Sequence, residues 1–179
     1  MEKRMTEQEL FACFDDAINF GHIFVTYQPK INHNTGRMIG AEALMRWKHP
    51  LYGMQYPSDF IPMLGKNDLI YRAYIAVFEK VCMFQRKCLD EGLDIVPISV
   101  NMSRYDIYRN NYADAIEQLR KKYDIPVKYI HVEITESSAI GGMELVSNVL
   151  NKLHDNGYTV DWMTLEAVIH PSMSSKTWL

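Results

Sequence analysis

The sequence predicts an α/β fold in which parallel strands are joined by helices. Some segments have apolar residues at helical spacing and others alternate apolar with polar residues, and from about Ile95 these two kinds of segment follow one another. A strand, helix, strand order of this kind implies parallel strands with helical crossovers. With 179 residues, 47% of them apolar, the chain is long enough to bury one core of ordinary domain size.

The N-terminal part is expected to form a helix and a hairpin. Thr6 and Glu9 have the spacing of a capping box, and the apolar residues that follow predict a helix to about Phe20. Two strands are predicted at Phe24–Ile31 and Met38–Trp47, with a turn between them. This pair predicts an antiparallel hairpin.

The remaining elements follow from caps, breaks and periodicity. Ser58 is expected to cap a short helix, which leads into a longer one with an apolar stripe from Ile70 to Phe84 that ends at Gly92. The alternating part is then a strand Ile95–Met102, a helix from about Tyr112 to Tyr123, a strand Tyr129–Thr135, a helix from about Met143 to His154, and a strand from Tyr158.

Charge and composition limit the classes of function. The formal net charge is −3, and no basic stripe offers a surface for long nucleic acid. No apolar run approaches the ~20 residues of a membrane span, so a cytoplasmic protein is expected. Cys13, Cys82 and Cys88 match no zinc-binding spacing and lie among apolar residues, which predicts buried free thiols.

Polar side chains are predicted on one face of three strands. Alternation places Glu42, Leu44 and Arg46 on one face of the second strand, and it places Asn101 and Glu133 on the polar faces of the next two. The C-terminal ends of parallel strands are where a β/α barrel builds its active site. Carboxylate and carboxamide oxygens suit Mg²⁺ or Mn²⁺ better than Zn²⁺, and Arg46 suits a phosphate oxygen.

Each of these residues also has a purely structural interpretation. Glu42 or Glu133 could be a strand carboxylate that pairs with Arg or Lys, and Asn101 could cap the following turn. Their joint placement favours a site, because acids on neighbouring strands repel each other unless a cation or base compensates them.

Five short motifs occur in an order that resembles the EAL domain. They are Tyr27-Gln28-Pro29, Glu42-Ala43-Leu44 with Arg46, Phe60-Ile61-Pro62, Asn101-Met102-Ser103 and Glu133-Ile134-Thr135-Glu136. The resemblance runs from about Phe24 to Asp161. It implies a TIM-like (β/α) barrel of the EAL type, here partial and without its last strands and helices.

The resemblance also implies an activity and a set of roles. The family is expected to hydrolyse cyclic di-GMP to linear pGpG by attack of a metal-bound hydroxide, with Mg²⁺ or Mn²⁺ as cofactor. By match to the motifs, Glu42, Asn101 and Glu133 would bind the metal. Gln28, Leu44 and Arg46 would contact the substrate, and Glu136 would anchor a loop.

The last 18 residues depart from the family pattern. Relatives continue with Asp-Asp-Phe-Gly, whereas this chain has Trp162-Met163-Thr164-Leu165, and Asp161 stands two residues before the expected pair. We interpret Asp161 as an ordinary strand residue. One added base before codons that fit the tail would restore Met-Asp-Asp-Phe-Gly-Ser-Gly-Tyr-Ser-Ser, which predicts a single-base deletion. The expected organisation is a truncated EAL domain at 1–161 and a frameshifted tail at 162–179.

Three functional hypotheses remain open. The first is an inactive relative of the cyclic di-GMP phosphodiesterases. The second is a module that binds cyclic di-GMP or a protein without catalysis. The third is a working enzyme, either because a second copy completes its site or because the natural full-length gene is intact. An open barrel edge is further expected to promote self-association.

Overall fold

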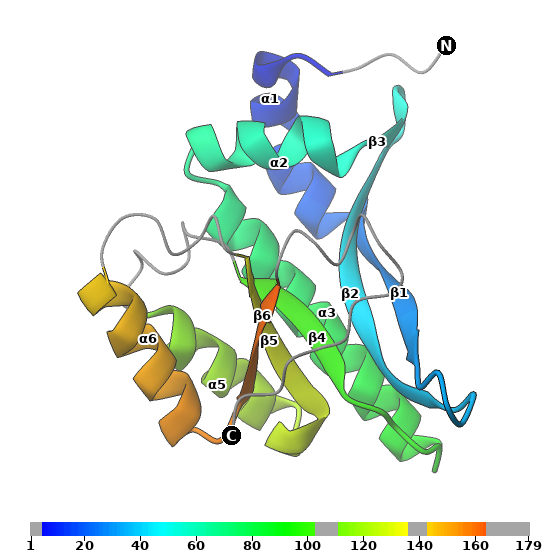
Figure 1. Cartoon of the computed structure of the whole chain (residues 1–179). Helices are drawn as coiled ribbons and strands as arrows, with labels where there is room; N and C mark the ends of the chain where they lie inside the picture. The colour runs from blue at the N-terminus through cyan, green and yellow to red at the C-terminus, as the bar shows by residue number, and fades with distance from the viewer. Residues whose placement is uncertain (1–4, 103–110, 136–142, 164–179) are drawn as a thin grey trace.

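The computed structural model describes residues 5–102, 111–135 and 143–163, which form a mixed sheet flanked by helices (Figure 1). The helices are α1 (Glu7–Asn19), α2 (Pro57–Lys66), α3 (Ile70–Asp90), α5 (Tyr112–Lys122), the 3-10 helix η1 (Val127–Tyr129) and α6 (Met143–Asp155). The strands are β1 (Ile23–Ile31), β2 (Met38–His49), β3 (Gly53–Gln55), β4 (Ile98–Met102), β5 (Ile130–Thr135) and β6 (Thr159–Met163).

The sheet has the strand order β1-β2-β4-β5-β6, with β3 paired to β2. β1 and β2 form the predicted antiparallel hairpin, and β2, β4, β5 and β6 are parallel, as the alternation of strands and helices predicted. In the described part of the chain this order ends at β1 and β6, so the sheet is open. The short strand β3 was not predicted.

One apolar layer joins α3, α5 and α6 to one face of the sheet. Alternate residues of the strands, among them Ala43, Val100 and Val132, are at most 2% exposed in this layer. The helices contribute buried residues such as Val81 and Ile116. Because side chains alternate along a strand, the residues between these apolar positions point to the opposite face.

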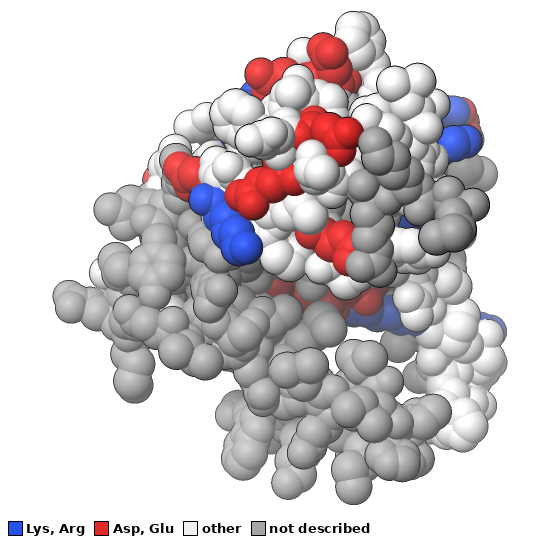
Figure 2. All heavy atoms as spheres, turned by 90° about the horizontal axis from the view of Figure 1, so that it is seen from above, with Lys and Arg blue, Asp and Glu red and all other residues white. Residues whose placement is uncertain are grey.

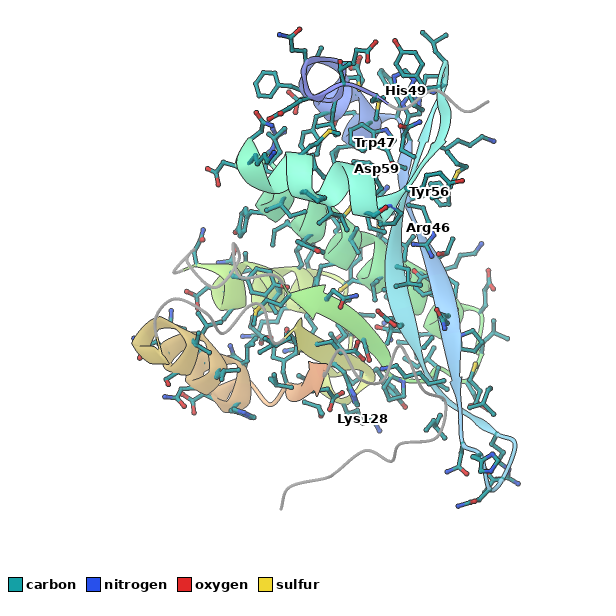
Figure 3. The ribbon with its side chains drawn as sticks, turned by 45° about the horizontal axis from the view of Figure 1, so that its top comes forward. Arg46, Trp47, His49, Tyr56, Asp59 and Lys128 are labelled. Carbon is teal, nitrogen blue, oxygen red and sulfur yellow. The ribbon has the colours of Figure 1, made fainter. Side chains whose placement is uncertain are left out.

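A second core fixes α1 and α2 to one end of β2. Trp47 (Figure 3) is fully buried there. Its ring packs edge-on against Phe14 of α1 and Phe60 of α2. α1 begins with the predicted capping box, in which Thr6 Oγ1 accepts a hydrogen bond from Glu9 N–H and the Glu9 carboxylate accepts one from Thr6 N–H. The position of α1 thus depends on both a cap and a core.

Two predicted element starts were wrong, and proline explains both. The N-cap of α2 is Tyr56 and not Ser58, with Pro57 in the first turn, where its missing N–H costs nothing. β4 begins at Ile98 and not at Ile95. Pro97 cannot donate to the ladder, although its carbonyl accepts a 2.9 Å hydrogen bond from Ala41 N–H.

The thiols are free, but only one of them is fully buried as predicted. Cys82 is buried, and burial raises the pKa of its thiol to about 12, so it stays protonated at neutral pH. Cys13 and Cys88 are half-buried. Within the described residues no helix is long and apolar enough to cross a membrane.

Candidate functional site

Strand register places the predicted polar residues on one face, opposite the apolar layer. Glu42 of β2 is paired with Ser99 of β4, while Asn101 is paired with Glu133 of β5, which in turn is paired with Asp161 of β6. In parallel strands, residues paired in this way point to the same face. The predicted grouping of Glu42, Asn101 and Glu133 on one face is therefore present.

Glu42 and Asn101 contact each other directly. Asn101 Nδ2 donates a hydrogen bond of 2.9 Å to Glu42 Oε1, and both side chains are half-buried. A hydrogen bond to a charged oxygen stabilises the carboxylate. It also orients the two side chains toward the same space between β2 and β4.

Glu133 is the most deeply buried acid on this face, and its partner is a lysine from the far side of β2. Glu133 is 4% exposed, and its carboxylate forms an ion pair with Lys30 of β1. Lys30 Nζ also donates a 2.7 Å hydrogen bond to Ser99 Oγ. The buried charge is thereby compensated within the protein, which corresponds to the structural interpretation left open for Glu133.

On the same face, Asp161 of β6 contacts a histidine. Asp161 Oδ2 lies 3.3 Å from His131 Nδ1, and both side chains are partly exposed. His131 is paired with Ser99 in the ladder, so it belongs to the same face. The sequence had given no role to either residue.

The donor atoms on this face suit a hard cation. Carboxylate, carboxamide and hydroxyl oxygens are typical ligands of Mg²⁺ and Mn²⁺. Over residues 5–102, 111–135 and 143–163, however, no three side chains of His, Cys, Asp or Glu are grouped closely enough to bind a metal ion. The Glu133 carboxylate is bound by Lys30 and that of Glu42 by Asn101.

The residues expected to contact substrate lie on the hairpin, on the same face as Glu42. Gln28 is exposed and paired with Glu42, and Leu44 is paired with Thr26. Arg46 is half-buried, and its Nη1 donates a 2.9 Å hydrogen bond to the carbonyl of Met45 (Figure 3). Glu136 lies outside the described residues.

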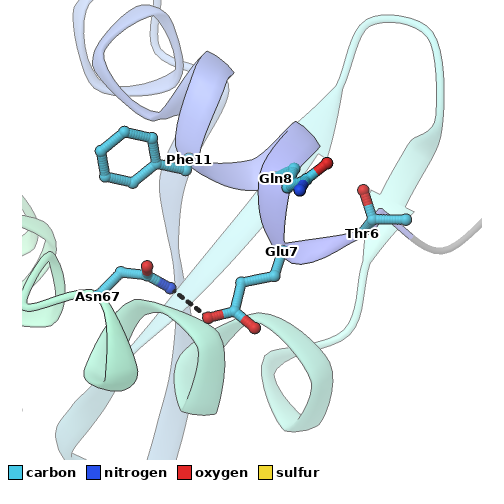
Figure 4. A pocket seen from close by; sticks show the side chains of 5 residues that line it. All are labelled: Thr6, Glu7, Gln8, Phe11 and Asn67. Atoms are coloured by element: carbon cyan, nitrogen blue, oxygen red, sulfur yellow. Dashed lines mark hydrogen bonds between the residues drawn. The ribbon is translucent and has the colours of Figure 1, made fainter.

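Two other surface features lie at the α1 and α2 end of the molecule. A hollow of about 640 Å³ is lined by Thr6, Glu7, Gln8 and Phe11 of the α1 region and by Asn67, whose Nδ2 donates to Glu7 Oε1 (Figure 4). Acidic side chains outnumber basic ones on the face seen from this end (Figure 2). This hollow shares no residue with the polar face of the sheet.

Known proteins place the chain in a family. The sequence profile of the EAL domain matches residues 13–161, which is most of the chain. The chain belongs to the EAL domain family. Phosphodiesterases of this family are generally metal-dependent.

Two relatives and two solved structures illustrate the match. The bifunctional diguanylate cyclase/cyclic di-GMP phosphodiesterase MucR of Pseudomonas aeruginosa is 30% identical over 79% of this chain and 21% of its own length. The probable cyclic di-GMP phosphodiesterase PdeG of Escherichia coli is 29% identical over 80% of this chain and 28% of its own.

The MucR phosphodiesterase in complex with cyclic di-GMP superimposes with a TM-score of 0.78, at 26% identity, over 89% of this chain and 67% of that chain. An EAL enzyme bound to cAMP and cyclic di-GMP superimposes with a TM-score of 0.77, at 22% identity, over 87% of this chain and 43% of that chain, and shows the fold alone. The chain described here therefore spans only 21% of the length of MucR and 28% of the length of PdeG.

Proposed function

We propose that the polar face is a cyclic di-GMP phosphodiesterase site that does not hydrolyse the nucleotide in this chain. The observation that carries the proposal is the partnering of the predicted ligands. Asn101 donates a hydrogen bond to Glu42 and Lys30 forms an ion pair with Glu133, so both acids already have partners within the protein. In this proposal Glu42, Asn101 and Glu133 correspond to the family's metal ligands, and Mg²⁺ or Mn²⁺ is the cation they would bind.

The sequence after Asp161 supports the same proposal. Trp162 to Leu179 does not contain the acidic segment that the family uses to complete the site. We assign the EAL domain to 1–161 and a frameshifted tail to 162–179. Sequencing the gene tests this assignment: a coding sequence in which one added base does not restore Asp-Asp-Phe-Gly would contradict it.

The direct test is hydrolysis of cyclic di-GMP by the purified chain with Mn²⁺ or Mg²⁺, with linear pGpG measured by chromatography. We expect no turnover above that of the Glu42→Ala variant, while circular dichroism shows both proteins folded. Turnover that Glu42→Ala abolishes would contradict the proposal. It would favour a site completed by a second copy, and sedimentation would then test the predicted self-association.

Binding without cleavage is the second candidate function. It is favoured by the placement of Gln28, Leu44 and Arg46 on one face of the hairpin, with Gln28 open to solvent. Arg46 would contact a phosphate through its planar guanidinium. Calorimetry with cyclic di-GMP should then show affinity that Arg46→Ala lowers and that Lys48→Ala, an exposed neighbour on β2, leaves unchanged.

Two expectations from the sequence stay predictions. They are the cytoplasmic location and the lack of binding to long nucleic acid. A filter-binding assay with duplex DNA at low salt tests the second.

A further inference from the structure

Lys30 reaches Glu133 along an unusual path. β2 lies between β1 and β4 in the sheet, yet the Lys30 side chain extends from β1 to Ser99 of β4 and Glu133 of β5. Its partner in the β1 and β2 ladder is Gly40, which has no side chain to block it. A Cβ at Gly40 would lie 3.9 Å from Lys30 Cδ and 3.0 Å from the Pro97 carbonyl oxygen.

The Lys30 side chain ends at the buried carboxylate of Glu133, which a positive charge stabilises. Glu133 is 4% exposed and Ser99 2%, so water cannot solvate the carboxylate fully. Lys30 keeps its own side chain 39% exposed and brings only its ammonium group to the buried acid. Among the described residues, it is the cation that forms an ion pair with Glu133.

An ammonium group and a divalent cation make competing demands on this carboxylate. Lys30 Nζ contacts Glu133 Oε1. A divalent cation at the same carboxylate would lie close to this ammonium group, and the two positive charges would repel each other in a partly buried site. Glu42 and Asn101 lie beside this position on the same face but are bound to each other. A cation bound to Glu133 would therefore have to displace the ammonium group of Lys30.

We propose that the ammonium group of Lys30 takes the place of a divalent cation at Glu133 and keeps Mg²⁺ and Mn²⁺ off this part of the polar face. The inference rests on the proposed function, because it uses the assignment of Glu133 as a cation ligand. Removal of Lys30 should therefore increase the affinity of the protein for the cation, an effect that loosening of the fold alone would not produce.

The test uses the full chain and MnCl₂ alone, with free Mn²⁺ measured by electron paramagnetic resonance. Lys30→Met should bind Mn²⁺ at least tenfold more tightly than the wild type, and the exposed Lys48→Met control should match the wild type. The double variant Lys30→Met with Glu133→Gln should lose the gain. Equal Mn²⁺ affinity in the wild type and Lys30→Met would overturn the proposal.

A second variant of Lys30 keeps the test decisive if Lys30→Met does not fold on its own. Lys30→Gln is neutral and keeps a hydrogen-bond donor on a side chain one bond shorter than lysine, so it serves as the second variant. If both variants fold only with metal, their refolding yield should rise with Mn²⁺, while that of the wild type should not. A yield that Mn²⁺ leaves unchanged would overturn the proposal.

Failure of this inference is distinguishable from failure of the proposed function. Hydrolysis of cyclic di-GMP by the wild type would contradict the proposed function. The Mn²⁺ affinities of the wild type and Lys30→Met would still test the role of Lys30. Equal affinities together with no hydrolysis would contradict only the role of Lys30.

Discussion

Two buried glutamates in this protein are held in different ways. Glu117 of α5 is 8% exposed and Glu133 of β5 is 4% exposed. Glu117 accepts hydrogen bonds of 2.8 and 2.7 Å from Arg120, one turn along the same helix, and one of 3.0 Å from the hydroxyl of Tyr158. Glu133 has its ion pair with Lys30, which is 103 positions away in the sequence.

The two glutamates differ in how firmly their partners are held. The hydrogen bond from Arg120 is the main cause that lowers the pKa of Glu117 to about 2, and both side chains are mostly buried. The side chain of Lys30 is more exposed than that of Arg120, and its ammonium group can turn into solvent. The Glu133 carboxylate could therefore exchange its partner, whereas that of Glu117 could not.

The largest expected effect is on stability at Glu117. Glu117→Gln should lower the free energy of unfolding by about 3 kcal/mol, because Arg120 would lose the carboxylate that compensates its buried charge. Urea unfolding measures this, with Glu91→Gln, an exposed residue after α3, as control. A loss under about 1 kcal/mol would show that Glu117 is as replaceable as Glu133.

The next effect is a dependence on pH. Since the pKa of Glu117 falls from the ordinary 4.5 to about 2 on folding, its stabilisation is complete above pH 4.5 and is lost as the pH falls toward 2. Unfolding free energies of the wild type and Glu117→Gln should converge over this window, by at most about 1.4 kcal/mol per pH unit. Parallel curves would contradict the account.

The smallest effect is expected at Glu133. Glu133→Gln should cost about 1 kcal/mol in urea unfolding, because the amide can still accept a hydrogen bond and Lys30 can return its charge to water. A loss as large as that of Glu117→Gln would show that Glu133 stabilises the fold as much as Glu117 does. It would also weaken the inference that its partner can be exchanged.

Alternation along the strands was enough to predict which residues share a face. It placed Glu42, Asn101 and Glu133 together, and the ladders confirm that placement, although their roles stay predictions. It could not predict Lys30, because the reach of a flexible side chain depends on what lies in its path. The hairpin register offered one signal, since it pairs Lys30 with Gly40.

The structure differs from the sequence predictions at a few further positions. Pro57 starts α2 in place of a serine cap, because its fixed φ and missing N–H suit a first helical turn. Phe84 was predicted in the apolar stripe of α3, but it is 43% exposed and stacks on Tyr27 of β1. The ladder between β5 and β6 brings Asp161 beside Glu133, which the spacing along the sequence alone did not show.

The central claim is that Glu42 and Glu133 on the polar face are already bound by the protein's own side chains. The most direct measurement is a crystal structure of the wild type grown with Mn²⁺, with anomalous data collected at the manganese edge. The account predicts no anomalous peak among Glu42, Asn101 and Glu133, with the ammonium group of Lys30 still bound to Glu133. A manganese peak bonded to Glu133, with Lys30 turned away, would contradict it.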